Sequence, residues 1–214
     1  MLTIHHLATS QSERIVWLCE ELGIAYEMKR YERRADNRLA PPEYKALHPI
    51  GIAPVITDDD LVLGESGAIV EYLIQTYGDG RLAVQRGEAG FADYLYWFHF
   101  ANGTLQATLG RVMALERVDP SEKNAPLRAA KDRLRLIFGA LEKRAGEVAY
   151  LAGAAFTAAD IMSVFSLTTM RLFKPVDLSP YPNILAYLQR IGARAGYQRA
   201  MAKADPGFAP MLGA

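Results

Sequence analysis

Apolar and polar residues in the first 78 positions follow two different periods. Residues 2–6, "LTIHH", form a short β-type run that predicts a strand, and residues 26–30 predict a second strand. Between them, apolar side chains recur at the spacing of one helix face, and Gly23 marks the end of that helix. The residues on this face are Ile15, Leu18, Cys19 and Leu22. The pattern therefore predicts a strand, a helix and a strand in succession.

The rest of this half adds an irregular segment, a hairpin and a helix. Residues 31–48 carry mixed polar residues and two adjacent prolines, which indicates at most a short helix. Two short apolar runs, "APVIT" and "LVLG", then flank the acidic turn "DDD" and predict a β-hairpin. A periodic apolar pattern begins at about Ser66 and ends at Gly78, which predicts another helix. We expect one compact α/β domain over residues 1–79.

After Gly78 the pattern is helical throughout. Two glycines and an arginine within residues 78–81 suit a linker. Helices are expected at 88–116, 121–146, 157–172, 182–193 and 196–203. We therefore expect an all-α domain, a helical bundle, over residues 87–214, so that the fold class is α/β plus all-α.

The composition of the chain indicates which classes of partner and which compartment to expect. Lys plus Arg and Asp plus Glu number 24 each, so the net charge is zero and we expect neither nucleic acid nor a membrane surface as a partner. The single cysteine, Cys19, cannot form an internal disulfide, and a lone thiol fits a reducing compartment. Charged residues interrupt the first twenty positions, and no apolar stretch approaches the roughly 20 residues that cross a bilayer. We expect a soluble, cytoplasmic protein without a signal peptide.

Pro54 stands within the apolar run "IGIAPVI", although a proline cannot donate a ladder hydrogen bond. A trans peptide bond on an edge strand is one explanation. The other is a cis bond in a tight turn, as in the thioredoxin-like fold, which this order of elements with a proline opening a central antiparallel strand resembles. In that fold the residue before the cis-proline, here Ala53, pairs its backbone with an extended thiol peptide.

Glu65 and Ser66 lie at the first turn of the helix that follows the hairpin. A helix start offers unsatisfied N–H groups to a carboxylate, and an acidic side chain beside it can hold an amine. An α-amino acid end carries both groups. The alternative is that the two residues only cap the helix.

The segment "HPIGIAPVITDDDLVLGESGAIVEYL" closely resembles the glutathione-binding segment of the cytosolic glutathione S-transferases, commonly of the form NPxGxVPVLxDxxxxLxESxAIxxYL. The segment "LAGAAFTAADI" resembles the capping motif of that family's second domain, with Thr157 and Asp160 as a T-x-x-D capping box that serves folding. On this resemblance the chain is identified as a member of the family, bacterial and serine-type, with an N-terminal thioredoxin-like domain and a homodimeric assembly.

The resemblance also implies a ligand and its contacts. Glutathione is expected as the co-substrate, without a metal. Ala53, with Ile52 and Pro54 beside it, would hold the cysteinyl backbone, while Glu65 and Ser66 would hold the γ-glutamyl end. Family members often carry Lys, Arg or Gln in place of Ile52, so the partner of the glycyl carboxylate stays open. Candidates by charge are Arg14, Arg33, Arg34, Arg38 and Lys45.

A hydroxyl is expected to stabilise the glutathione thiolate. An ordinary thiol has a pKa near 8.5, so ionising it at neutral pH takes a shift of about two units, or about 3 kcal/mol. The turn "LATSQSERIVWL" offers Thr9, Ser10 and Ser12 where the family keeps a Tyr, Ser or Cys. Alignment with serine-type relatives favours Ser10, and Ser12 and Thr9 stay open as alternatives. Cys19 lies on the apolar helix face and is expected in the core.

The second substrate is expected to contact the first long helix of the bundle, as the family resemblance implies. Candidate pocket residues there are Trp97, His99, Asn102, Gln106 and Arg111. The function we expect is glutathione conjugation to a small hydrophobic electrophile. The alternatives are glutathione-dependent disulfide or peroxide reduction at the same site, and a non-catalytic transferase-like binding scaffold.

Overall fold

A computed structural model of the chain describes residues 1–121 and 123–214, which form two compact units. The first unit contains residues 1–85 and 191–210, and the second contains residues 86–190 and 211–214. The sequence pattern places all of 87–214 in the helical domain. The structure differs for residues 191–210, which belong to the first unit because the last helix packs against the first one.

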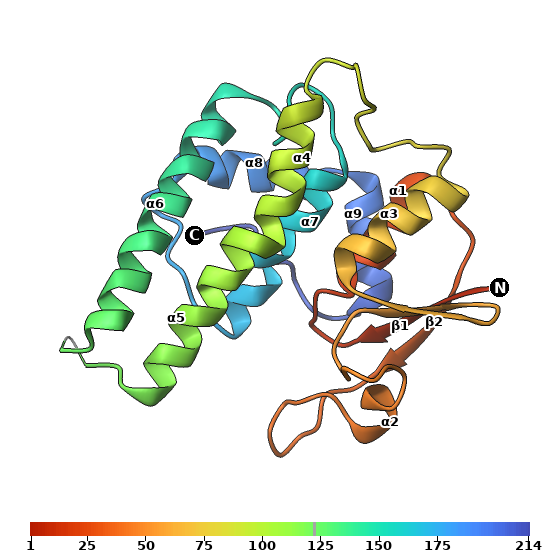
Figure 1. Cartoon of the computed structure of the whole chain (residues 1–214), viewed down its shortest axis with the longest axis horizontal. Helices are drawn as coiled ribbons and strands as arrows, with labels where there is room; N and C mark the ends of the chain where they lie inside the picture. The colour runs from red at the N-terminus through yellow and green to blue at the C-terminus, as the bar shows by residue number, and fades with distance from the viewer. Residues whose placement is uncertain (122) are drawn as a thin grey trace. The chain divides into compact units, whose positions relative to one another are not determined.

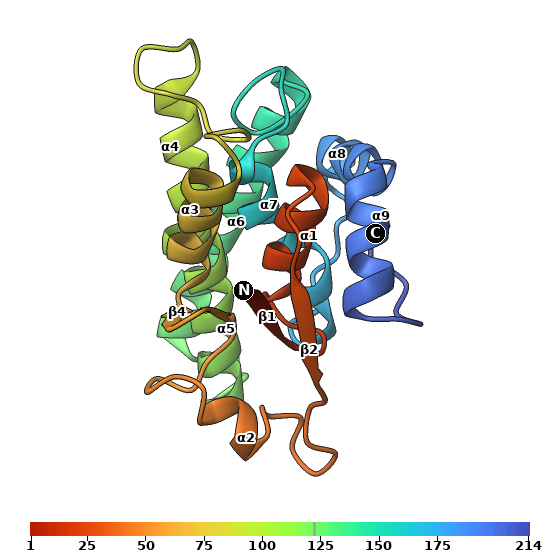
Figure 2. The ribbon, with the colours of Figure 1, turned by 90° about the vertical axis from the view of Figure 1, so that its right-hand side faces the viewer.

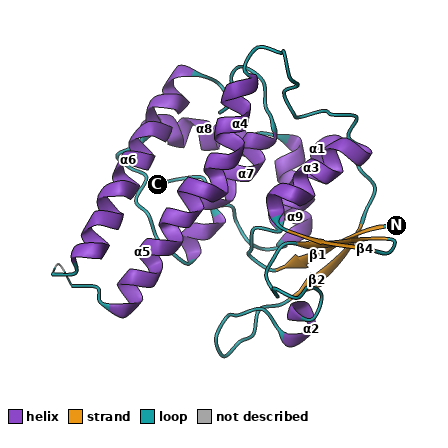
Figure 3. Cartoon of the chain, in the orientation of Figure 1, coloured by secondary structure: helices purple, strands orange, loops and turns teal. Residues whose placement is uncertain are grey.

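The first unit is built on a four-stranded mixed sheet with the strand order β2-β1-β3-β4 (Figure 3). Its strands are β1 Leu2–Leu7, β2 Glu27–Tyr31, β3 Val55–Asp58 and β4 Leu61–Gly64. Strand β1 runs parallel to β2 and antiparallel to β3, with Ile4 opposite Met28 on one side and Ile56 on the other. Strands β3 and β4 are the arms of the predicted hairpin, and β3 is a central strand.

Helices cover both faces of this sheet. They are α1 Glu13–Leu22, α2 Pro42–Lys45, α3 Ser66–Tyr77 and α9 Ala195–Ala204. Figure 1 shows α1, α3 and α9 on one face and the short α2 on the other. Gly23 closes α1 with φ 70°, a left-handed conformation that glycine adopts without steric cost. The elements predicted for residues 1–79 are thus confirmed, and they form a thioredoxin-like domain.

Helix α9 lies beside α1 within the first unit (Figure 2). The rings of Trp17 and Tyr197 meet edge to face, with centroids 4.9 Å apart. At the end of α1, the Arg194 guanidinium donates to both carboxylate oxygens of Glu21 at 2.8 Å each. These contacts join segments more than 170 positions apart in the chain, so local sequence patterns cannot predict them.

The second unit is helical. Its helices are α4 Phe91–Phe100, α5 Ala107–Val118, α6 Ala125–Glu147, α7 Ala158–Leu167 and α8 Pro182–Gly192. The helix expected over 88–116 is interrupted by a π-helical segment, Ala101–Gln106, between α4 and α5. The helix expected over 157–172 ends as α7, and a 3-10 turn, Thr169–Leu172, follows it. The expected start of the 121–146 helix includes residue 122, which lies outside the described residues.

The capping box at the start of α7 is confirmed. Asp160 Oδ2 accepts from the Thr157 N–H at 2.9 Å. Asp160 Oδ1 accepts from the Leu151 N–H at 2.9 Å and from the Tyr187 hydroxyl at 3.0 Å. The carboxylate is fully buried, so it joins α7, α8 and the preceding loop at one point.

Across residues 1–121 and 123–214, every helix is either too short or too polar to cross a lipid bilayer.

Candidate active site

The turn before β3 has the geometry that the sequence suggests. The Ala53–Pro54 peptide bond is cis, so the edge-strand alternative with a trans bond is wrong. Pro54 is buried, Ala53 is half-buried and Ile52 is exposed. The Gln11 side-chain amide donates to the Ala53 carbonyl at 2.8 Å. This bond fastens the loop after β1 to the cis-proline turn.

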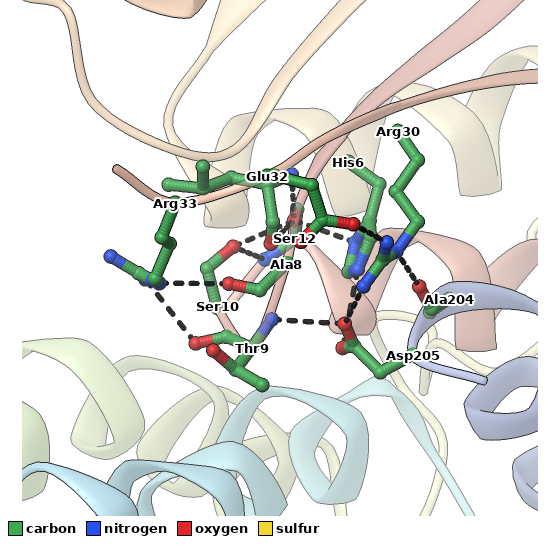
Figure 4. A network of polar contacts seen from close by, with 11 residues as sticks. His6, Ala8, Thr9, Ser10, Ser12, Arg30, Glu32, Arg33, Ala204 and Asp205 are labelled. Carbon is green, nitrogen blue, oxygen red and sulfur yellow. Dashed lines mark hydrogen bonds and ion pairs between the residues drawn. The ribbon is translucent and has the colours of Figure 1, made fainter. Parts of the chain in front are cut away.

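The three candidate hydroxyls lie in the loop between β1 and α1, at different depths (Figure 4). Thr9 is half-buried and has φ 49°, an unusual conformation for a residue with a side chain. Ser10 is 4% exposed, and Ser12 has no exposed surface. The Ser10 and Ser12 hydroxyls are hydrogen-bonded at 2.7 Å, and the Ser12 N–H donates to Ser10 Oγ at 3.2 Å. Ser12 is therefore an interior residue, and Ser10 is the next one outward.

His6 and Asp205 extend this hydroxyl pair into the protein (Figure 4). His6 Nδ1 lies 2.9 Å from Ser12 Oγ, and His6 Nε2 lies 3.2 Å from Asp205 Oδ2. Asp205 Oδ1 accepts from the Thr9 N–H at 3.0 Å. His6 is 0% exposed and Asp205 2%. The sequence pattern does not place Asp205 near the first strand, because the two are joined only by the packing of α9.

The neighbouring histidine faces the other side of β1. His5 Nδ1 lies 3.0 Å from the Tyr31 hydroxyl, and its Nε2 lies 3.2 Å from Thr57 Oγ1. Burial, together with nearby Lys29, lowers the pKa of His5. Alternation along a strand predicts that His5 and His6 point to opposite faces, and their separate partners agree with this.

Two arginines fix the outer side of the Ser10 loop. Arg33 donates to the Ala8 carbonyl at 2.8 Å and to the Thr9 carbonyl at 3.2 Å. Arg30 donates to the Ala204 carbonyl at 2.8 Å and contacts Asp205 Oδ1 at 3.4 Å. Arg33 thus holds the backbone of the loop by charge-assisted hydrogen bonds, whereas Arg30 holds Asp205 and the end of α9 beside it.

Arg14 organises the inner side of the site. Its guanidinium, at 0% exposure, donates to Gln11 Oε1 at 2.8 Å and to Ser66 Oγ at 3.1 Å. Burial lowers the pKa of Arg14 to about 9, an effect that nearby Glu13 opposes, and the group stays a cation at neutral pH. A buried cation is costly unless it is well bonded, so this arginine belongs to the interior and the suggestion that it meets a ligand carboxylate is not supported.

The start of α3 carries the predicted acid and serine. Glu65 has φ 67° and ψ 113°, which is strained for a residue with a side chain, and it makes no side-chain cap bond to the helix. The Glu65 side chain is exposed, whereas Ser66 is buried. The interpretation that Glu65 only caps the helix is therefore wrong. Backbone strain of this kind concentrates where a side chain must be aimed for function.

The other charge candidates have different surroundings. Arg34 pairs with Asp36, and the Arg33 guanidinium is engaged by backbone carbonyls. Lys45 and Arg38 are exposed. No group of three or more His, Cys, Asp or Glu side chains suited to a metal ion occurs in the part of the chain that the structure describes.

The five pocket candidates of the second unit do not share one environment. Trp97 is buried, with its ring 4.8 Å from that of Phe100. His99 is exposed, and Asn102 and Gln106 are half-buried in the π-helical segment. Arg111 is also exposed and lines a cavity between α5 and α6. Asn102 and Gln106 therefore share one segment and one degree of burial, whereas Trp97 is buried in α4 and Arg111 is exposed on α5.

The first unit thus has a thioredoxin-like fold with a cis-proline turn and an acid–serine pair at a helix start, and the second unit of the same chain is helical. The family described as "Glutathione S-transferase, N-terminal domain" matches residues 2–75, and "Glutathione S-transferase, C-terminal domain" matches residues 104–195. The chain therefore belongs to the glutathione S-transferase family, and it is a glutathione transferase.

Individual relatives agree with this assignment. The chain is 30% identical over 220 residues to glutathione S-transferase 3 of Schizosaccharomyces pombe, covering 96% of this chain and 88% of the relative. A crystal structure of a glutathione S-transferase from Actinobacillus pleuropneumoniae superposes with a TM-score of 0.87 at 32% identity, covering 99% of both chains. A theta class enzyme from Xanthomonas axonopodis pv. citri, solved with glutathione bound, gives 0.71 at 26% identity over 93% of this chain and 96% of that one.

Proposed function

We propose that this chain is a serine-type transferase that binds glutathione on its first unit and conjugates it to a small hydrophobic electrophile. The observation that carries the proposal is a single network. Gln11 bonds to Ala53, Arg14 bonds to Gln11 and Ser66, and Ser10 lies in the same loop as Gln11. Hydrogen bonds thus join the three segments that the proposal assigns to glutathione, which are the Ser10 loop, the cis-proline turn and the start of α3.

Each segment has one role in this proposal. Ala53 pairs its backbone with the cysteinyl residue beside Pro54, and Glu65 with Ser66 holds the γ-glutamyl end. Ser10 donates to the thiolate. A hydrogen bond to a charged group is worth about 1.5–3 kcal/mol, which supplies much of the roughly 3 kcal/mol that ionisation requires.

The electrophile contacts the long helix of the second unit in this proposal. Asn102 and Gln106 are the favoured polar contacts, because they lie together in a π-helical segment, and such segments often occur at functional sites. His99, Trp97 and Arg111 are less favoured, since they lie in different surroundings.

Calorimetry with glutathione followed by turnover of an aryl halide tests the proposal. We expect binding that Glu65→Ala weakens by about 10- to 100-fold, and conjugation faster than disulfide exchange. The reverse order of the two rates would make the chain a reductase on the same site. Binding without either reaction would leave a transferase-like scaffold.

We also propose a homodimer in the cytoplasm, on the family resemblance and the lone thiol. Sedimentation at micromolar concentration should give twice the 23.7 kDa chain mass. A single-chain mass throughout would contradict the assembly but not the chemistry.

A further inference from the structure

Four buried groups form a continuous hydrogen-bonded chain that begins at the proposed thiolate donor, Ser10 (Figure 4). Ser10 Oγ to Ser12 Oγ is 2.7 Å, Ser12 Oγ to His6 Nδ1 is 2.9 Å, and His6 Nε2 to Asp205 Oδ2 is 3.2 Å. The exposed fractions of all four residues lie between 0% and 4%. Nothing in the proposed role of Ser10 alone requires the three inner groups to be aligned in this way.

The carboxylate at the inner end sets the positions of the protons. Burial opposes the charge of Asp205, but hydrogen bonds from His6, the Thr9 N–H and Arg30 lower its pKa below the ordinary value. An ionised carboxylate only accepts, so His6 Nε2 must carry a proton and donate it to Asp205. In a neutral imidazole Nδ1 is then an acceptor, so Ser12 donates to His6.

Because Ser12 donates its proton to His6, the Ser10 hydroxyl proton points toward Ser12. The Ser12 oxygen, which also accepts from the Leu7 N–H at 3.2 Å, is left to accept from Ser10. The Ser10 proton is then engaged with Ser12. A proton that reaches Ser10 Oγ from the ligand side can pass along the same hydrogen bonds to His6 Nδ1, and the reversed chain then leaves a Ser10 proton facing sulfur.

We propose that His6 is the acceptor of the glutathione thiol proton. The S–H bond breaks and its proton passes to Ser10 Oγ. The original Ser10 proton passes to Ser12 Oγ, and the original Ser12 proton passes to His6 Nδ1. The products are a thiolate that accepts a hydrogen bond from Ser10 and an imidazolium paired with Asp205. No proton leaves the complex and no other reactant takes part.

Asp205 is the positioning residue for this transfer. It fixes the His6 tautomer that can accept a proton at Nδ1, and it faces the imidazolium after the transfer, as the acid does in a Ser-His-Asp triad. The other charged groups near this carboxylate are Arg30 and Arg33, which carry the opposite sign. Both arginines favour the ionised form of Asp205. Arg30 and the Thr9 N–H bond to its Oδ1, which leaves Oδ2 for His6.

The inference rests on the proposed stabilisation of the thiolate by Ser10. Counting the protons released on binding tests the role of His6 separately from that of Ser10. Glutathione is titrated into the full-length wild-type protein at neutral pH, in two buffers of different ionisation enthalpy. Thiolate is measured in parallel by its ultraviolet absorbance. We expect bound thiolate with far less than one proton released per thiolate. Release of one full proton per thiolate would overturn the role of His6 and leave Ser10 intact. Binding without thiolate would overturn both.

Histidine nitrogen resonances give a second readout that needs no variant to fold. The chain has only four histidines, and labelled imidazole nitrogens distinguish a neutral ring from an imidazolium. We expect one buried histidine to change from neutral to doubly protonated when glutathione binds and to return when S-methylglutathione, which has no thiol proton, replaces it. An unchanged neutral signal in both complexes would refute the proposal.

Asp205→Asn tests the tautomer. The Asn oxygen would stay with the Thr9 N–H and Arg30, so its amide NH₂ would face His6 Nε2 and force the proton onto Nδ1. In this variant His6 cannot take up the thiol proton, so we expect about one proton released per thiolate, with a dissociation constant for glutathione within about threefold of wild type. Asp177→Asn, at an exposed carboxylate bonded to Ser179, is the matched control. Equal proton counts in both variants and wild type would contradict the relay.

Discussion

Arg14 on α1 and Ser66 at the start of α3 are joined by a buried hydrogen bond of 3.1 Å, although 52 positions separate them in the chain. The same guanidinium holds Gln11, whose amide holds the Ala53 carbonyl. One cation therefore sets the distance between the proposed thiol end and the proposed γ-glutamyl end of the ligand.

Replacing Arg14 should affect both stability and glutathione binding. Arg14→Met keeps most of the buried volume but leaves Gln11 Oε1 and Ser66 Oγ without this donor, which costs about 1–3 kcal/mol. We expect a lower denaturation midpoint and a dissociation constant for glutathione raised by tenfold or more. Arg34→Met, at an exposed arginine paired with Asp36, is the control and should change neither quantity. Unchanged affinity in Arg14→Met would show that the two ends are positioned independently.

Variants that remove each of the three loop hydroxyls should differ in their effects on kcat and on stability. Ser10→Ala is expected to lower kcat by about 10- to 100-fold with little change in affinity for glutathione. Ser12→Ala removes a hydroxyl bonded to His6 and to the Leu7 backbone, so it should also lower the free energy of unfolding by about 1–2 kcal/mol. Thr9→Val should leave kcat within about twofold. A large kcat loss in Thr9→Val alone would assign the thiolate contact to Thr9.

Glu65 offers a test that separates strain from binding. Glycine accepts a positive φ without steric cost, whereas alanine does not. Glu65→Gly should therefore be more stable than Glu65→Ala by about 0.5–1 kcal/mol, and both should bind glutathione equally weakly. Chemical denaturation and calorimetry on the pair measure the two effects. A difference in affinity between the two variants would show that the backbone conformation at residue 65 also determines binding.

Asp160 should be the most sensitive carboxylate of the helical unit. Asp160→Ala leaves the N–H groups of Leu151 and Thr157 and the Tyr187 hydroxyl buried without their acceptor. We expect a loss of about 2–4 kcal/mol in the free energy of unfolding. Asp177→Ala on the surface should cost within about 0.5 kcal/mol. Equal losses of unfolding free energy in the two variants would show that the buried bonds of Asp160 contribute little to stability.

Cys19 should be unreactive in the folded protein. It is 0% exposed, and burial, with the nearby charge of Glu20, raises the pKa of its thiol to about 12. Only the thiolate reacts with alkylating agents, so mass spectrometry should find no modification of the native chain at pH 8 and full modification in denaturant. Because the folded chain keeps this proton to higher pH than the unfolded chain, Cys19 also lowers stability as the pH rises above about 9. Cys19→Ala should conjugate glutathione at the wild-type rate.

Sequence patterns were sufficient for elements with strong local signals. The first strand, the helix that ends at Gly23, the hairpin after Pro54 and the Thr157–Asp160 box all depend on residues close together in the chain, and the structure has each of them. The π-helical segment at Ala101–Gln106 was not predicted, because one extra residue in a helical turn leaves the apolar period almost unchanged.

The site was only partly predictable for a related reason. Motif residues such as Ala53, Glu65 and Ser66 lie within fourteen positions of one another, so their spacing carries information. The His6–Asp205 contact joins positions 199 apart, and no periodicity connects them. Charge alone makes Arg14 one of five equal candidates for the glycyl carboxylate, and only its two buried acceptors distinguish it from the other four.

Because residues 191–210 complete the first unit, the unit proposed to bind glutathione is not a contiguous stretch of the chain. A chimera that keeps only the first 85 residues of this chain would keep His6 and lose its own Asp205, so the His6–Asp205 contact would depend on the residue that the other parent supplies. A chimera that exchanges the first unit intact needs two crossovers, one on each side of residues 86–190.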